Sequence, residues 1–416
     1  MLNNIIKKID EGKLNSIFIL ITVFSFPVIA LVNYLFEVKL GYVSKSFRVF
    51  NMVFSFYLIY RFIVKLKFDF TLFKKAIKKY YYIALFFLFL IFYLVRLVFD
   101  LEVYHINEIT VIPSAKNYFY LYAIGVTFIP MIAAFTITKL DFNFLKIYLY
   151  RYLITLNTLL IIIFFVERFI NNQTGYRFIV TKNEVEYFNA ISIAVNGGLL
   201  VIMSFLNISK SKFNYILIGV GFFLILTTAS RGPILSILIS LIFILIFKDK
   251  KINIKYLYLT FVMAGTVLVN YLMTLFFSDY FIAGNAFFHR LNNLNDDQST
   301  ISRLKITKDA FSQILDSPIF GSHFLVIESK MYSHNILLDI LISTGLLGVL
   351  LIIPIYLFFA KNIIYKVPYT YITVIGFFYF LNTMTSGSIY NNYEFWIIFA
   401  VIIGYQSKHY KTKLIK

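Results

Sequence analysis

Long apolar stretches, separated by short polar segments rich in lysine, run through the whole 416-residue chain. A membrane-spanning helix needs about 20 predominantly apolar residues, and this criterion marks twelve candidates. They cover about 14–36, 48–64, 80–99, 118–138, 147–166, 187–206, 213–229, 233–247, 256–277, 336–360, 368–383 and 394–406. The pattern predicts an all-α polytopic membrane protein with about twelve spanning helices, in which residues 1–416 form a single transmembrane domain.

The positions of the lysines and arginines orient these helices. Dense, short clusters such as Lys74, Lys75, Lys78 and Lys79 fall on alternate connections, and cytoplasmic loops of membrane proteins carry such an excess. Both termini are therefore predicted to be cytoplasmic. The first apolar stretch follows three lysines and has no small-residue cleavage site, which favours a retained signal anchor. This orientation places one long loop, residues 278–335 between the ninth and tenth helices, on the outer side.

Composition narrows the class of protein further. Hydrophobic residues make up 60% of the chain and charged residues 14%, against about 45–50% and roughly 25% in a soluble domain, so a water-soluble enzyme is excluded. The cytoplasmic clusters account for most of the net charge of +19, and nucleic acid is not an expected partner. The chain has no cysteine, which excludes disulfides and thiolate metal sites. The predicted spans carry almost no charge at mid-membrane, which argues against an ion-driven transporter. Three arginines lie near helix ends and are expected to reach the interface: Arg61, Arg96 and Arg151.

The connection between the seventh and eighth helices is the first candidate functional segment. Ser230 is a good N-cap and Pro233 suits a first helical turn. The eighth helix then begins at the outer surface, where its free N–H groups favour an anion. Arg231 beside them is explained either by a bound anion or by a role as an interfacial anchor.

The long outer loop supplies the other two segments. Ile301, Leu304, Phe311 and Ile314 recur at helical spacing, which predicts a short amphipathic helix on the membrane surface or over the bundle. Arg303 lies at the flank of this stripe and is either a solvated surface arginine or a functional one. His334 and Asn335 begin the tenth helix, and His334 alone is equally well explained as a surface residue or as a functional one. Asp339 shares a helical face with Asn335 and lies about a turn into the membrane, where an ionisable group is usually functional or specifically paired.

Together these segments resemble the O-antigen ligase and polymerase family of bacterial envelope glycosyltransferases, over about residues 215–360. The resemblance rests on Ser230-Arg231-Gly232, on Arg303 followed by Pro318 to Gly321, and on His334-Asn335 followed by Gly345 to Gly348. The chain departs from the family pattern where Ser322-His323 replaces a second glycine. A glycine eleven residues after an arginine, described for some polymerases, is missing after both Arg177 and Arg303.

The resemblance implies a C-type membrane glycosyltransferase that uses an undecaprenyl-diphosphate-linked oligosaccharide on the outer side of the bacterial cytoplasmic (inner) membrane, facing a periplasm or the exterior. It implies that Arg231 and Arg303, with Arg177, bind the diphosphate and that His334 accepts a proton. Ser230, Gly232, Asn335 and Asp339 would support them. No cofactor and no metal is expected, although the acidic pair Asp100 and Glu102 is kept as a minor metal-binding alternative. Membrane lipid and a chain-length regulator protein are the further expected partners.

The resemblance leaves two enzymatic functions open, and a non-enzymatic function is weighed against them. A polymerase that joins lipid-linked repeat units of a surface polysaccharide is favoured, because His334-Asn335 runs straight into an apolar helix and the Phe, Tyr, Ile and Lys bias is typical of that divergent group. An O-antigen ligase that transfers the glycan to lipid A-core uses the same donor chemistry and is the alternative. A lipid-linked oligosaccharide flippase predicts no long outer loop, so the segment 278–335 argues against it.

Overall fold

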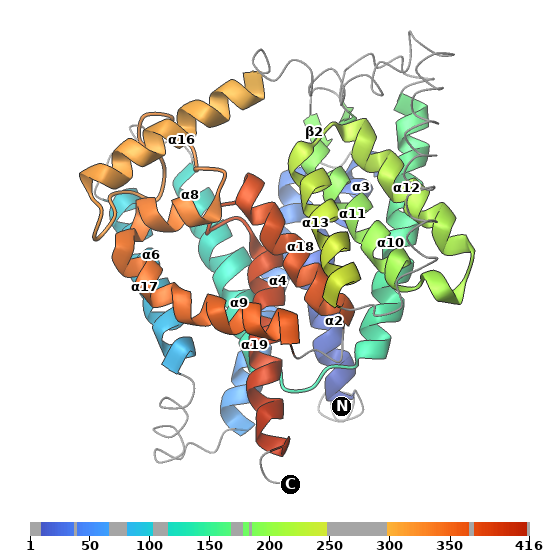
Figure 1. Ribbon diagram of the computed structural model, residues 1–416, viewed down its shortest axis with the longest axis horizontal. Helices are drawn as coiled ribbons and strands as arrows, with labels where there is room; N and C mark the ends of the chain where they lie inside the picture. Colours follow the sequence, from blue (N-terminus) through green and yellow to red (C-terminus); the bar gives the residue numbers. More distant parts are fainter. Residues whose placement is uncertain are drawn as a thin grey trace. The chain divides into compact units, whose positions relative to one another are not determined.

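The computed structural model describes residues 10–36, 40–65, 81–102, 115–167, 178–182, 185–247, 298–365 and 370–413. These residues are mostly helical, as the hydrophobic pattern predicts (Figure 1). The α-helices are α2 (Glu11–Phe24), α3 (Phe26–Phe36), α4 (Leu40–Lys65), α6 (Tyr81–Glu102), α8 (Ala115–Tyr120), α9 (Ile129–Thr136), α10 (Phe142–Phe165), α11 (Ala190–Leu206), α12 (Phe213–Thr228), α13 (Arg231–Phe247), α16 (Gln298–Asp316), α17 (Ile336–Tyr365), α18 (Thr370–Ser386) and α19 (Tyr393–Lys413). A π-helix, η1 (Leu121–Phe128), joins α8 to α9, and a 3-10 turn, η3 (Ile208–Lys210), follows α11. Strands β1 (Val180–Lys182) and β2 (Val185–Phe188) pair antiparallel.

Within the described part of the chain, five helical segments are long and apolar enough to cross a membrane. They are Val43–Val64, Tyr81–Glu102, Lys116–Thr136, Phe142–Phe165 and Ile336–Ile364. The pair α2 and α3 makes a sixth if it is counted as one broken span. The predicted span at 256–277 lies outside the described residues, so the count of twelve and the orientation stay predictions.

Local chemistry explains where several helices begin. The carboxylate of Asp141 accepts the N–H of Phe144 at 2.9 Å and caps α10, and the side chain of Asn189 accepts the N–H of Ser192 at 2.7 Å and caps α11. Such caps satisfy backbone donors that have no partner inside the helix.

Three predicted spans differ from the structure. The first is not continuous, because α2 and α3 meet at a 57° bend where Pro27 cannot extend the preceding helix. The sixth begins later than predicted, since residues 187 and 188 belong to β2 and the helix starts after its cap at Asn189. The tenth is interrupted at Gly345, whose φ of 62° and ψ of −160° are not helical.

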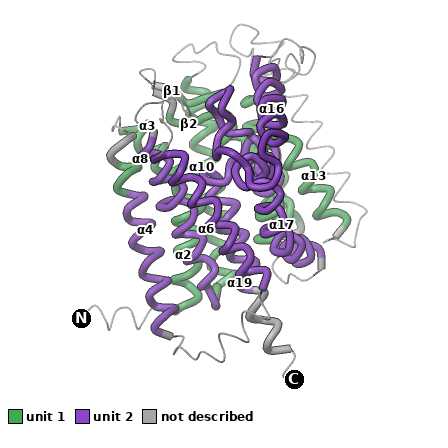
Figure 2. The backbone as a smooth tube through the Cα atoms, turned by 90° about the vertical axis from the view of Figure 1, so that its left-hand side faces the viewer, with its two compact units in different colours: residues 1–46, 140–297, 369–378 green, residues 47–139, 298–368, 379–416 purple. Residues whose placement is uncertain are grey.

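The chain divides into two compact units, each assembled from separate stretches (Figure 2). Unit 1 contains 1–46, 140–297 and 369–378, and unit 2 contains 47–139, 298–368 and 379–416. In unit 1, α11 packs closely on α12. The two backbones can approach because Gly197 and Gly221 have no Cβ, and a Cβ on either glycine would overlap the carbonyl oxygen of the other. In unit 2, α17 packs on α6 and α19 packs on α9.

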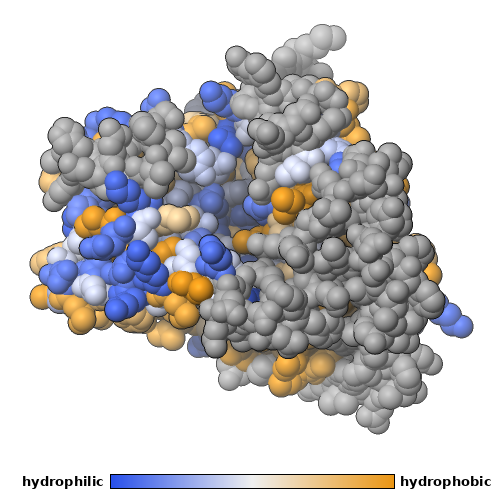
Figure 3. Space-filling model, turned by 90° about the horizontal axis from the view of Figure 1, so that it is seen from above, coloured by the Kyte–Doolittle hydropathy of each residue, from blue (hydrophilic) through white to orange (hydrophobic). Residues whose placement is uncertain are grey.

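The predicted amphipathic helix is α16, but its packing face differs from the expected one. Ile306, Ala310 and Gln313 are its buried residues, and Ile306 and Ala310 pack with Val326 and Ile342. Of the predicted stripe, Ile314 packs against this cluster, whereas Ile301, Leu304 and Phe311 are exposed. The helix carries a second exposed face that is polar, and Figure 3 shows such side chains in blue, bordered by hydrophobic ones in orange. Its members are Ser302, Lys305, Lys308, Ser312 and Asp316.

Candidate functional site

His334 lies in a strained turn immediately before α17. Its φ of 59° is in the left-handed region, which a non-glycine residue occupies only when its surroundings hold it there. The carbonyl of His334 accepts the N–H of Gly387 at 3.2 Å. The neighbouring Asn335 donates from Nδ2 to the carbonyl of Met384 at 3.1 Å. Its Oδ1 accepts the N–H of Leu337 at 2.9 Å and so caps α17.

Asp339 stabilises the same turn through hydrogen bonds of its carboxylate. Its side chain is 1% exposed, and Oδ1 accepts the N–H and the hydroxyl of Ser333 at 3.2 and 3.0 Å. Oδ2 accepts the N–H of Ile389 at 3.0 Å. The carbonyl of Ile389 in turn accepts the indole N–H of Trp396 at 2.9 Å. Of the two roles open for this carboxylate, the structure therefore shows specific pairing, which joins the His334 turn to the segment after α18.

Arg303 lies in the second turn of α16 and faces the same region of unit 2. Its Nη1 donates to the carbonyl of Thr385 at 3.1 Å. Burial lowers the pKa of His334 to about 4, with a smaller contribution from the positive charge of Arg303. The imidazole is therefore neutral near pH 7. Its Nδ1 is buried and has no hydrogen-bond partner among the described residues, and its ring lies 4.3 Å from that of Tyr332.

The turn from Pro318 to Gly321 docks into the break in α17. The N–H groups of Leu346 and Leu347 donate to the carbonyls of Pro318 and Ile319 at 2.9 and 3.0 Å. Gly345 has a positive φ, and a Cβ there would overlap the backbone of Ile319. The two glycine motifs noted in the sequence are therefore two halves of one contact.

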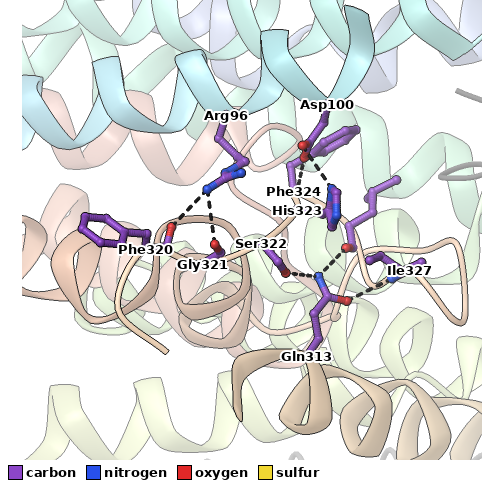
Figure 4. Close-up of polar contacts among 10 residues, drawn as sticks. Arg96, Asp100, Gln313, Phe320, Gly321, Ser322, His323, Phe324 and Ile327 are labelled. Atoms are coloured by element: carbon purple, nitrogen blue, oxygen red, sulfur yellow. Dashed lines mark hydrogen bonds and ion pairs between the residues drawn. The ribbon is translucent and has the colours of Figure 1, made fainter. Parts of the chain in front are cut away.

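Gly321 completes this contact from the other side. Its φ is 69°, and a Cβ would lie 2.5 Å from the carbonyl oxygen of Ile342. The next residue, Ser322, donates its N–H to that same oxygen at 2.8 Å. Arg96 of α6 donates from Nη2 to the carbonyl of Gly321 at 3.2 Å (Figure 4). Arg96 therefore binds backbone carbonyls of this turn, and its expected position at the membrane interface stays a prediction.

The residues that replace the family's second glycine have their own partners (Figure 4). His323 Nδ1 lies 3.1 Å from Asp100 Oδ1, and Asp100 Oδ2 accepts the N–H of Phe324 at 2.8 Å. Gln313 of α16 donates to the hydroxyl of Ser322 at 2.8 Å and accepts the N–H of Ile327 at 3.0 Å. Asp100 thus ties the loop to α6, and Gln313 ties it to the helix that carries Arg303.

Asp100 and Glu102 do not act as a pair in the structure. Glu102 contacts the ammonium of Lys116 and accepts the hydroxyl of Tyr120 at 2.7 Å, whereas Asp100 is engaged by the loop after α16. The two carboxylates have separate partners on separate elements, so the minor metal-binding alternative has no support from their geometry.

Arg231 belongs to unit 1 and is the first residue of α13. The preceding α12 ends at Thr228, and its C-cap Ala229 has a φ of 50°. The supporting roles of Ser230 and Gly232 stay predictions. The N–H of Phe178 donates to the carbonyl of Thr227 at 3.0 Å, which fixes β1 beside this turn. Arg177 lies outside the described residues, so its part in the site stays a prediction. The structure brings Arg303 and His334 together within unit 2, and the meeting of Arg231 with them also stays a prediction.

Sequence analysis missed the last turn of α18 and the residue that follows it. Thr385, Met384 and Gly387 hold the site through backbone carbonyl and N–H groups, and such contacts leave no residue signature. Of these three positions, only Gly387 needs a particular residue type, because a Cβ there would overlap the carbonyl oxygen of Thr383.

The apolar helices indicate a multi-pass membrane protein. A polar turn, held by hydrogen bonds, lies at the N-terminus of the candidate spanning helix α17 and forms the candidate site. Residues 216–353 match the family model described as O-antigen ligase. The matched region contains Arg231, Arg303 and His334 and is similar to the O-antigen ligase family over about a third of the chain. No curated protein and no solved structure matches the chain.

Proposed function

We propose that the protein is a polymerase that joins undecaprenyl-diphosphate-linked oligosaccharide repeat units of a surface polysaccharide on the outer side of the bacterial cytoplasmic membrane. The observation that carries the proposal is that His334, whose imidazole is neutral near pH 7, and the guanidinium of Arg303 are both held at the C-terminal end of α18 in unit 2. Glycosyl transfer from a diphosphate needs a proton acceptor and a cation, and these two side chains supply them.

The reaction assigns one role to each group. The oxygen of an acceptor hydroxyl attacks the anomeric carbon of the donor sugar, and the bond between that carbon and the diphosphate oxygen breaks. The electron pair leaves with the diphosphate, and the hydroxyl proton passes to His334, as general base catalysis requires. Arg303, with Arg231 and Arg177, neutralises the leaving group, because guanidinium matches phosphate geometry and stays charged. The N-terminus of α13 adds the positive end of its helix dipole beside Arg231, and this scheme requires no metal or cofactor.

The two roles reinforce each other electrostatically. In the structure the charge of Arg303 contributes to the low pKa of His334. A diphosphate bound to Arg303 brings negative charge to the same place, which raises the pKa of a neighbouring base. The imidazole therefore becomes a stronger proton acceptor when the donor is bound.

The polymerase is preferred to the ligase because His334 and Asn335 lead directly into the apolar helix α17. The family description names the ligase, so a gel of the host's surface glycan with and without the gene is the deciding experiment. One repeat left on the acceptor, with the ladder lost, supports the polymerase. An acceptor without repeats, while long polymer accumulates on the lipid carrier, overturns it in favour of the ligase.

Two variants test the diphosphate site separately from the linkage formed. Arg231→Ala and Arg231→Lys are both expected to abolish glycan assembly with an unchanged protein level in the membrane, because an ammonium cannot make a bidentate contact. Full activity in either variant contradicts the assigned role. A chain-length regulator is a further proposed partner, and its loss would change the length of the ladder without removing it.

A further inference from the structure

A row of aromatic side chains leads away from His334 within unit 2. The ring of Tyr332, next to His334, lies 6.4 Å from that of Tyr390. Tyr390 lies 5.2 Å from Phe119, and Phe119 lies 5.6 Å from Tyr118. The row ends at Tyr122, whose ring centroid is 4.3 Å from that of Tyr118.

This row combines buried rings with partly exposed ones. Tyr390 and Phe119 are buried, and both contact the ring of Phe324 beneath them. Tyr118 is 43% exposed, while Tyr332 and Tyr122 are half-buried. We call Tyr332, Tyr118 and Tyr122 the aromatic strip. Partly exposed rings that rest on buried aromatic neighbours are rigid surfaces for a ligand.

Arg48 of α4 adds a cation at the far end of the strip. Its Nη2 donates to the hydroxyl of Tyr122 at 2.6 Å, and its Cζ lies 4.3 Å from the centroid of the same ring. Among the residues that the structure describes, no carboxylate pairs with Arg48. A guanidinium has five N–H donors in a fixed plane, and among the described residues the hydrogen bond to Tyr122 uses one of them.

The backbone beneath Tyr122 is π-helical. Pro130 lies just past η1, where it has no N–H and its ring would clash with the carbonyl four residues earlier. The N–H of Ile129 instead reaches the carbonyl of Ile124, five residues back. Thr127 within η1 donates its hydroxyl to the carbonyl of Tyr390 at 2.6 Å, which locks the π-helix to a buried residue of the row. π-Helical turns occur frequently at functional sites.

We propose that the aromatic strip with Arg48 binds the acceptor glycan and presents its attacking hydroxyl to His334. Sugars expose C–H faces that stack on aromatic rings and hydroxyls that accept hydrogen bonds from guanidinium. Ligand sites typically combine such aromatic walls with a few well-placed polar groups. Because the strip ends at the imidazole that takes the proton, it is assigned to the acceptor and not to the donor. The inference rests on the proposed function and extends it to substrate recognition.

Kinetics of the purified full-length protein test the strip against the alternative that these tyrosines only anchor the protein at the membrane interface. Tyr118→Leu is expected to raise KM for the acceptor about 2- to 10-fold, in line with the strength of aromatic contacts, and to leave kcat within about twofold. Tyr118→Phe keeps the ring and should behave as wild type. Tyr60→Leu, at an exposed tyrosine of α4 outside the strip, is the matched control. An unchanged KM in Tyr118→Leu, or an equal rise in Tyr60→Leu, overturns the proposal.

Binding without turnover keeps this inference separate from the proposed function. Trp396, the single tryptophan, is fully buried, so Tyr118→Trp adds a surface fluorophore. The probe is the host's own repeat-unit glycan, released from its lipid, with dextran as the control. Saturable quenching by the repeat unit, weakened by Arg48→Gln, supports the strip even if no transfer is detected. Transfer that depends on His334 while the fluorescence does not respond to glycan refutes the strip alone.

Discussion

Replacing Gly345 by alanine is expected to undock the turn from Pro318 to Gly321. At φ 62° and ψ −160° the backbone is in a region that only glycine readily occupies, and alanine costs about 1–3 kcal/mol there. The added Cβ also meets the backbone of Ile319. The two hydrogen bonds from Leu346 and Leu347 to this turn are then lost, at about 0.5–1.5 kcal/mol each. The total of roughly 2–6 kcal/mol approaches the whole stability of a typical domain.

Thermal unfolding of the detergent-purified protein, together with the glycan gel, measures this effect. Gly345→Ala should lower the melting temperature by several degrees and abolish glycan assembly, because α16 and Arg303 are positioned through the displaced loop. Leu346→Ala is the control, since it changes an exposed neighbouring side chain and keeps its backbone N–H. A Gly345→Ala protein with wild-type melting temperature and a normal ladder would refute the interlocked glycine contact.

Three further predictions address the site. Arg303→Gln should raise the pKa of His334 but leave it below 6.5, because burial is the larger cause of the shift, whereas Arg303→Lys should leave it low. Identical histidine NMR titrations for wild type and Arg303→Gln would contradict the electrostatic link. Asp100→Ala leaves the buried N–H of Phe324 without its acceptor, which should reduce the free energy of unfolding by about 1–3 kcal/mol; a denaturation midpoint equal to that of wild type would count against this role. Asn335→Ala removes the cap of α17 and should lower the free energy of unfolding by about 0.5–2 kcal/mol, most of which Asn335→Ser should restore. Equal stability of the alanine and serine variants would show that the side chain does not act as a cap.

The parts of the fold that were predictable depend on local signals. Pro233 falls in the first turn of α13, Asn335 caps α17, and α16 ends just before Pro318, all as the residue types indicate. The bend after α2 and the break at Gly345 were missed, because hydropathy registers apolar length and does not register helix continuity.

The candidate site was predictable only in its most distinctive side chains. Arg303 and His334 were singled out by residue type and order, and the structure brings them together. Their supports were not accessible to the same reasoning. Asp100 and His323 are separated by 223 residues, and the partner of Arg303 is a backbone carbonyl of Thr385, which any residue could supply.

Reconstitution of the purified protein in liposomes with the host's lipid-linked repeat unit tests the central claim most directly. The products are separated by length on a gel, for wild type and for His334→Asn at equal protein level. The account predicts a ladder of lipid-linked products for wild type and none for His334→Asn. A ladder of equal intensity from His334→Asn, or the absence of any extended product from wild type with this substrate alone, would contradict it.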